Sequence, residues 1–220
     1  MAFIEFLCFN GLSHAAIVNY ITGVKNKLKW YSLDISVFEH PKVVTMLRGV
    51  ERTAHVIRQP KAIIEVNMLK QMIWCNASLE NARMFNCLFL IAYFGFFRIS
   101  NLAPVNVNSF DFKKHLCRGD VIIQDEGVVI VVKWSKTIRN FSQGTYIVLP
   151  KLTGSVLCPH NAVVTWLRNS KGGHNDPLFT INHKPVSQYQ IRKHLAKNVS
   201  VIGRDPINYP FHSFRRSGPC

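Results

Sequence analysis

Apolar residues recur at helical spacing in the first part of the chain. Ser13 is a typical N-cap residue, and one apolar face of the helix predicted after it consists of Ile17, Ile21, Val24 and Leu28. A further helix is predicted from Pro41, with Val43, Leu47 and Val50 as its apolar stripe. The opening segment is therefore predicted to be entirely helical.

The stretch His55–Lys61 has no apolar period, and it contains Arg58 and Pro60. Such a stretch is typical of a basic linker between domains. The sequence therefore predicts a small helical domain over residues 1–57 and a larger domain over residues 61–220.

The larger domain begins with helical spacing, then changes to an extended pattern, then returns to helices. Helices are predicted over Asn67–Trp74 and Leu79–Phe97, from Pro159, and after an S-x-x-Q capping box formed by Ser187 and Gln190. Strands are predicted over Val121–Gln124, Val128–Trp134 and Tyr146–Pro150. The expected fold class is mainly α with a small three-stranded antiparallel β-sheet (α+β).

Charge points to a polyanionic partner. The 220 residues contain 27 Lys and Arg against 12 Asp and Glu, a formal charge of +15, while 48% of the residues are hydrophobic. A folded protein with this excess repels itself unless an anion neutralises it, so nucleic acid or an anionic membrane surface is expected. The longest apolar run, Phe85–Phe97, is too short to span a bilayer and includes Asn86. We therefore expect no membrane-spanning segment and no signal peptide.

The six cysteines form no C-x-x-C pair and the nine histidines form no H-x-x-x-H pair. Metal sites and disulfide frameworks usually show regular spacing, so free thiols, no metal and no cofactor are expected.

Arg98 follows directly after the buried apolar run, in Gly95-Phe96-Phe97-Arg98-Ile99-Ser100-Asn101-Leu102. A guanidinium beside a core needs an anionic partner because arginine cannot lose its charge. The alternatives are an arginine that reaches solvent or one that pairs with a carboxylate such as Asp111.

His212 and Arg215 are spaced by one helical turn in His212-Ser213-Phe214-Arg215-Arg216-Ser217. The pair can offer a bidentate fork to a phosphate beside a group that exchanges a proton, or it can be an ordinary surface histidine near a basic turn. A third position of interest is Lys133-Trp134-Ser135-Lys136-Thr137, where a strand enters a loop.

The order of these three motifs resembles the active-site series of the tyrosine recombinase (phage integrase-like) family. The motifs Phe-Phe-Arg-Ile-Ser-Asn-Leu and His-Ser-Phe-Arg-Arg-Ser are similar to those of the recombinases of eukaryotic mobile elements. The resemblance covers about 61–218. It implies the recombinase catalytic fold after residue 61 and part of the helical core-binding domain before it. It also implies duplex DNA as partner, other copies of the chain on DNA, and a nuclear location.

In such enzymes a tyrosine attacks the scissile phosphate and forms a 3′-phosphotyrosine without a metal. The resemblance makes Arg98 and Arg215 the phosphate-clamping arginines, Lys136 (or else Lys133) the general acid, and His212 a proton-transfer residue. DNA-binding cations are expected on the helix before His212 and on the first long helix: Arg192, Lys193, Lys197, Lys25 and Lys29. An ordinary solvated face and helix-dipole compensation are the alternatives for these cations.

Two positions depart from the family pattern. Asn101 stands where an acidic residue usually follows the first arginine, and the chain ends at Cys220 with all six tyrosines before His212. From the sequence as written we expect a DNA-binding protein related to recombination and integration that cannot cleave DNA. Three alternatives remain: a fragment of an active mobile-element recombinase, a binding-only or interaction protein derived from such an element, and a degenerate product without a stable fold.

Overall fold

A computed structural model describes residues 2–53, 61–77, 81–134 and 144–216. The chain divides into two compact units, Met1–Gln59 and Pro60–Cys220, and each has its own buried core. The predicted linker His55–Lys61 lies, except for Lys61, outside the described residues. Within the described ranges no helix is both long and apolar enough to cross a membrane.

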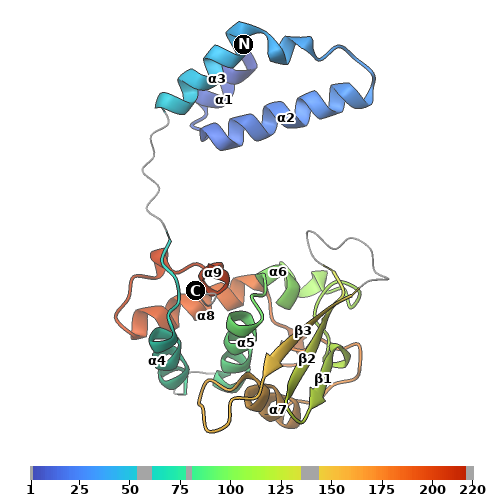
Figure 1. Cartoon of the computed structure of the whole chain (residues 1–220), viewed down its shortest axis with the longest axis vertical. Coiled ribbons are helices and arrows are strands. Elements are labelled where there is room, and N and C mark those ends of the chain that lie inside the picture. The colour runs from blue at the N-terminus through green and yellow to red at the C-terminus, as the bar shows by residue number, and fades with distance from the viewer. Residues whose placement is uncertain (1, 54–60, 78–80, 135–143, 217–220) are drawn as a thin grey trace. The chain divides into compact units, whose positions relative to one another are not determined.

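The first unit is helical, as its apolar spacing predicts (Figure 1). It contains α1 (Ala2–Phe9), α2 (His14–Trp30), a 3₁₀ turn (Ser36–Glu39) and α3 (Pro41–Thr53). The Ser13 hydroxyl accepts the backbone N–H of Ala16 at 3.3 Å, so the predicted cap of α2 is confirmed. Helix α1 lies in the segment predicted to be helical, but its bounds were not predicted, because its aromatic residues show no simple helical stripe. The core of this unit is small and consists of Ile4, Leu7, Ile17 and Val43.

The second unit is also mainly helical and contains the three-stranded antiparallel sheet that the sequence predicts (Figure 1). Its helices are α4 (Val66–Asn76), α5 (Ala82–Phe94), α6 (Ile99–Leu102), α7 (Pro159–Asn169), α8 (Gln188–Val201) and α9 (Ser213–Arg216), with 3₁₀ turns at Val107–Ser109, Arg118–Asp120 and Pro206–Asn208. The main sheet has the order β1 (Val121–Gln124), β2 (Gly127–Val132) and β3 (Thr145–Pro150). A two-stranded hairpin of β4 (Thr180–Ile181) and β5 (Lys184–Pro185) was not predicted, because its strands are too short to show a period.

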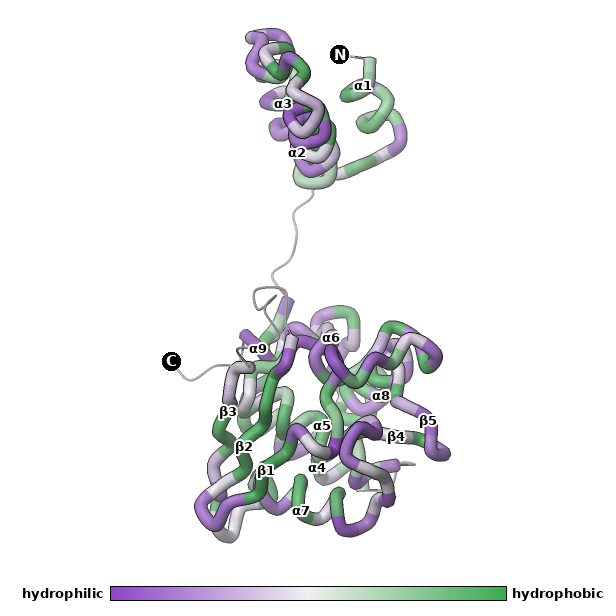
Figure 2. Tube along the Cα trace, turned by 90° about the vertical axis from the view of Figure 1, so that its right-hand side faces the viewer, coloured by the Kyte–Doolittle hydropathy of each residue, from purple (hydrophilic) through white to green (hydrophobic). Residues whose placement is uncertain are grey.

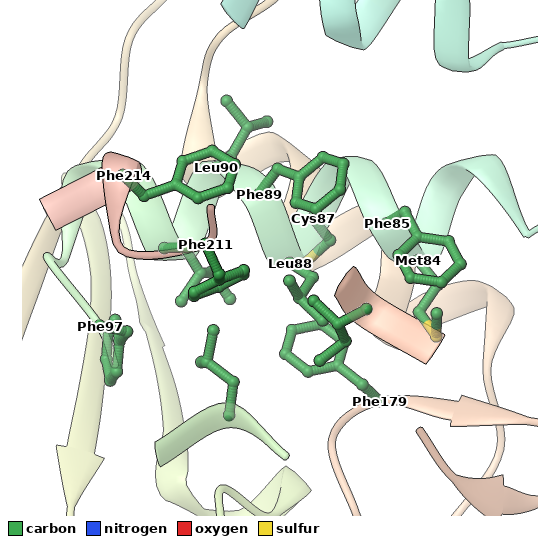
Figure 3. Close-up of a cluster of buried hydrophobic side chains, with 14 of the residues drawn as sticks. Met84, Phe85, Cys87, Leu88, Phe89, Leu90, Phe97, Phe179, Phe211 and Phe214 are labelled. Carbon is green, nitrogen blue, oxygen red and sulfur yellow. The ribbon is translucent and has the colours of Figure 1, made fainter. Parts of the chain in front are cut away.

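Helix α5 lies at the centre of this core. Most of its residues are buried, and Phe89, Phe179 and Phe214 are among the largest fully buried side chains (Figure 3). Helix α7 packs against α5 and also against β2 and β3, so it joins the sheet to the helices. The hydropathy trace is consistent with this core, since β2 and much of α5 are hydrophobic (Figure 2).

The end of α5 differs from the prediction. The sequence predicted a helix over Leu79–Phe97, but α5 ends at Phe94 and Gly95 is its C-cap residue. Phe96 then takes a left-handed conformation with φ +51°, and the ring of Phe97 fills the space where a Cβ of Gly95 would lie. The apolar composition concealed this stop, because Phe96 and Phe97 continue the hydrophobic run while the backbone turns.

Candidate functional site

Arg98 and Arg215 are far apart in the sequence, and the structure brings them to one pocket. The pocket has a volume of about 190 Å³. Arg98 immediately precedes α6, and Arg215 lies in α9. The remaining lining residues come from the α5–α6 turn, from α6 and from β2 and β3: Gly95, Phe96, Phe97, Asn101, Val132, Thr145 and Ile147.

The two guanidinium groups have no carboxylate partner among the described residues. Asp111, a possible partner of Arg98, instead binds Lys114 at 3.1 Å. Burial, and then the positive charge of Arg98, lower the pKa of the Arg215 guanidinium. Arginine nevertheless stays charged at neutral pH, so two like charges meet without compensation in a partly enclosed pocket. Such a pocket is suited to an anion with several oxygen atoms.

Asn101 fixes the position of the Arg98 turn. Its side-chain Oδ1 accepts the backbone N–H of Arg98 at 3.3 Å, and its Nδ2 donates to the carbonyl of Trp134 at 2.8 Å. The amide therefore joins the turn before α6 to the segment just after β2. A carboxylate at this position could accept the first hydrogen bond but could not donate the second while ionised. Asparagine in place of an acidic residue therefore provides a hydrogen bond that a carboxylate could not donate, and residue 101 still lines the pocket.

Arg215 is fixed by the residues around it in α9. The Phe214 ring is fully buried and stacks on Phe89 with 5.3 Å between ring centroids. The Ser213 hydroxyl donates to the carbonyl of Ala62 at 2.6 Å, which ties α9 to the start of this unit. These contacts leave the Arg215 side chain at the pocket.

His212 precedes this short helix, and its carbonyl accepts the backbone N–H of Arg215 at 3.1 Å. The side chain of His212 is exposed and is not among the residues that line the pocket. The imidazole of His212 is therefore not part of the pocket lining, and its role in proton transfer stays a prediction.

The ammonium group of Lys133 is occupied by three neighbouring residues. Its Nζ lies 2.6 Å from Asp120 Oδ2 and 3.4 Å from Cys117 Sγ, and it also donates to the carbonyl of Phe112. Lys133 therefore anchors the end of β2. Lys136 lies outside the described residues, and its assignment as the active-site lysine stays a prediction.

No family model and no curated protein matches this sequence. Solved structures do match. An integrase of the transposon Tn1549, in complex with a circular-intermediate DNA, superposes with a TM-score of 0.58 and 14% identity over 97% of this chain and 68% of that one. The site-specific recombinase XerH, bound to its difH substrate in a pre-cleavage complex, gives a TM-score of 0.50 and 11% identity over 94% of this chain and 58% of that one.

The chain has the tyrosine recombinase fold.

The tyrosine recombinase fold is shown by structural similarity, because the sequence identities of 11% and 14% are too low to show more than a shared fold. The 220 residues span 58% of the XerH chain and 68% of the Tn1549 integrase chain. The roles of individual residues therefore rest on the geometry of this molecule.

Within the recombinase fold, the predicted DNA-binding cations lie on two helices. On α8, Arg192, Lys193 and Lys197 are all exposed, and Arg192 donates to Gln188 Oε1 at 3.2 Å. On α2, Lys25 pairs with Glu39 at 3.0 Å while Lys29 is exposed. The pairing with Glu39 partly neutralises Lys25, so the α8 cations are the more accessible group for a polyanion.

Sequence reasoning missed Phe96 and Thr145, both of which line the arginine pocket. Thr145 begins β3, and nothing in its neighbourhood distinguishes it from other strand residues. Phe96 was hidden inside the apolar run that predicted a longer helix. Its left-handed backbone costs about 1–3 kcal/mol for a residue other than glycine, and such conformations cluster at functional sites.

Proposed function

We propose that this protein binds duplex DNA in DNA recombination or integration and holds one backbone phosphate between Arg98 and Arg215. The observation that supports the proposal is the pair of uncompensated guanidinium groups in one pocket of a tyrosine recombinase fold. The matched Tn1549 integrase and XerH are both in complex with DNA, and the +15 formal charge favours the same partner here.

The chemistry of a phosphodiester fits this pocket. Each arginine offers a planar fork of N–H donors to the non-bridging oxygens, and charge-assisted hydrogen bonds of this kind are the strong ones. Preplaced cations also stabilise the negative charge that builds on those oxygens during attack at phosphorus. If a longer form of the chain supplies an attacking tyrosine, Lys136 is proposed as the proton donor to the leaving oxygen and His212 as its helper.

The test is duplex binding by Arg98→Ala and Arg215→Ala over a series of salt concentrations. Each variant should bind more weakly by about 1.5–3 kcal/mol, because charge-assisted hydrogen bonds to the phosphate are removed. The slope of log affinity against log salt should fall by about 0.9 for each phosphate that is no longer neutralised. Fluorescence anisotropy with a short labelled duplex measures both quantities.

Arg204→Ala is the matched control, because Arg204 is exposed and does not line the pocket. It removes the same charge and should change affinity much less. Arg98→Lys should recover part of the affinity but not all, since an ammonium lacks the bidentate fork. Equal effects of all three alanine variants would sink the proposal, because the pocket would then contribute only its charge.

The proposed function of these 220 residues is binding without strand cleavage. No tyrosine lines the arginine pocket among the described residues. Tyr146 adjoins the pocket residues Thr145 and Ile147, but alternation along β3 turns it to the opposite face, where it is 67% exposed. A nicked suicide duplex should therefore give no covalent adduct on a denaturing gel, and an adduct mapped to any tyrosine would contradict this.

The second candidate is a strand-transferring recombinase of which these residues form a part. It is favoured by the share of the matched chains that they span, 58% and 68%. Sequencing the native transcript across the codon for Cys220 tests it. A frame that continues to a histidine or tryptophan and then a tyrosine supports the enzyme, whereas a stop codon there excludes it.

A further inference from the structure

We propose that the ring of Phe96 packs against the deoxyribose next to the phosphate that Arg98 and Arg215 hold. The inference rests on the proposed function, since it needs a nucleotide in the arginine pocket. It assigns a nucleoside contact to a residue whose type suggests only a core position.

Phe96 lies at the pocket and not in the core. It lines the same pocket as Arg98 and Arg215, and its side chain is 38% exposed. The next residue, Phe97, is only 3% exposed and packs over Gly95. Two adjacent phenylalanines thus have different environments, and of the two only Phe97 belongs to the buried core.

The backbone of Phe96 has a conformation that disfavours a bulky side chain. A φ of +51° suits glycine, and a bulky side chain in that region is disfavoured. Glycine would let the chain turn from α5 to Arg98 without this cost. Neither the turn nor the core therefore explains an aromatic ring at this position, while a ligand in the pocket does.

The chemistry of the ligand selects the sugar as the group that the ring touches. The charged oxygens of a clamped phosphate face the two guanidinium groups, and each phosphodiester is flanked by two sugars. In a duplex the base faces are covered by their stacked neighbours, whereas the carbon edges of the deoxyribose remain accessible along the backbone. An aromatic ring beside the phosphate pocket can bury such an edge and gain hydrophobic contact.

The experiment uses the full chain and compares two probes, a short duplex and inorganic polyphosphate, which has the phosphates without the sugars. Phe96→Ala should weaken duplex binding by about three- to tenfold, the effect of a partly buried apolar contact, with the salt slope unchanged. Its affinity for polyphosphate should stay at the wild-type value. Trp74→Ala, which removes an 84% exposed aromatic ring from α4, is the control and should change neither.

Phe96→Gly separates binding from folding. Glycine fits the left-handed backbone, so this variant should melt no lower than the wild type while it loses duplex affinity as Phe96→Ala does. Three results overturn the inference: wild-type duplex affinity in Phe96→Ala, equal weakening for duplex and polyphosphate, or affinity loss only in step with a lower melting temperature. If Arg98→Ala also binds both probes normally, the proposed function itself fails.

Discussion

His194 lies where three helices of the second unit meet. Its ring stacks on Phe85 of α5 with 3.5 Å between centroids, and its Nε2 lies 2.6 Å from Asn76 Oδ1 of α4. The Asn76 amide donates onward to Asn86 Oδ1 at 2.6 Å, so its own oxygen is left to accept from the imidazole. Burial, and then the positive charge of Lys197, lower the pKa of His194 to about 4. The imidazole is therefore neutral in the folded protein at neutral pH.

The free energy of unfolding should consequently fall as the pH drops from about 6.5 toward 4. In this window the unfolded chain takes up a proton on His194 that the folded chain does not, so acid favours unfolding. Chemical denaturation of wild type and His194→Gln at pH 8 and pH 4.5 measures the effect.

The stability difference between the two proteins should be largest at pH 8 and smaller at pH 4.5. His115, whose pKa burial also lowers, should leave some pH dependence in the variant. A stability difference that does not change with pH would show that folding leaves the pKa of His194 unchanged.

Residues of the pocket could be predicted from the sequence where their chemistry requires a binding partner. Arg98 was selected because a guanidinium beside a core is costly without an anionic partner, and Arg215 because its spacing of one helical turn from His212 suits a phosphate; both line the pocket. The hydrogen bonds of Asn101 to Arg98 and Trp134 could not be predicted, because they depend on where β2 ends. Phe96 could not be predicted as a pocket residue, because hydrophobicity does not report a backbone dihedral angle.

At the scale of the element, α8 is the best candidate for binding the DNA backbone. Replacing Arg192, Lys193 and Lys197 together by alanine should lower the salt slope by up to about 3, because each cation can neutralise one phosphate. All three are exposed, and their removal should leave the melting temperature within a few degrees of the wild type. A salt slope equal to that of the wild type would show that this face is only solvated.

Helix starts were predictable because a single side chain marks them. Ser187 and Gln190 form the expected capping box, in which Gln190 Oε1 accepts the backbone N–H of Ser187 at 2.8 Å. The bounds of α1 and the end of α5 were not predictable, because the aromatic residues at both places hide the local signal. The sheet was found through its alternation, although β2 ends at Val132, before the predicted Trp134.

At the scale of the whole molecule, two cores of unequal size divide the chain. In the part of Met1–Gln59 that the structure describes, the core has four buried side chains, whereas that of Pro60–Cys220 extends from Ile64 to Phe214. Small cores bury a smaller share of their surface and are correspondingly marginal. The first unit also exposes large apolar side chains, among them Phe9 at 94% and Trp30 at 84%.

Thermal unfolding should therefore show two transitions, with the first unit melting at the lower temperature. Calorimetry of the full chain and of a chain that begins at Lys61 measures this, and only the upper transition should remain in the shorter chain. A chain with no cooperative transition at all would favour the degenerate alternative raised by the sequence.

The Asn101 bridge makes the alignment of Arg98 independent of protons. An amide keeps one donor and one acceptor at every pH, so the turn that holds Arg98 and the segment after β2 stay joined whatever the acidity of the surroundings. Aspartate at this position would make the second hydrogen bond depend on pH, because a carboxyl group can donate to the Trp134 carbonyl only when it is protonated. The wild-type amide instead keeps both hydrogen bonds of the Arg98 turn at acid and at neutral pH alike.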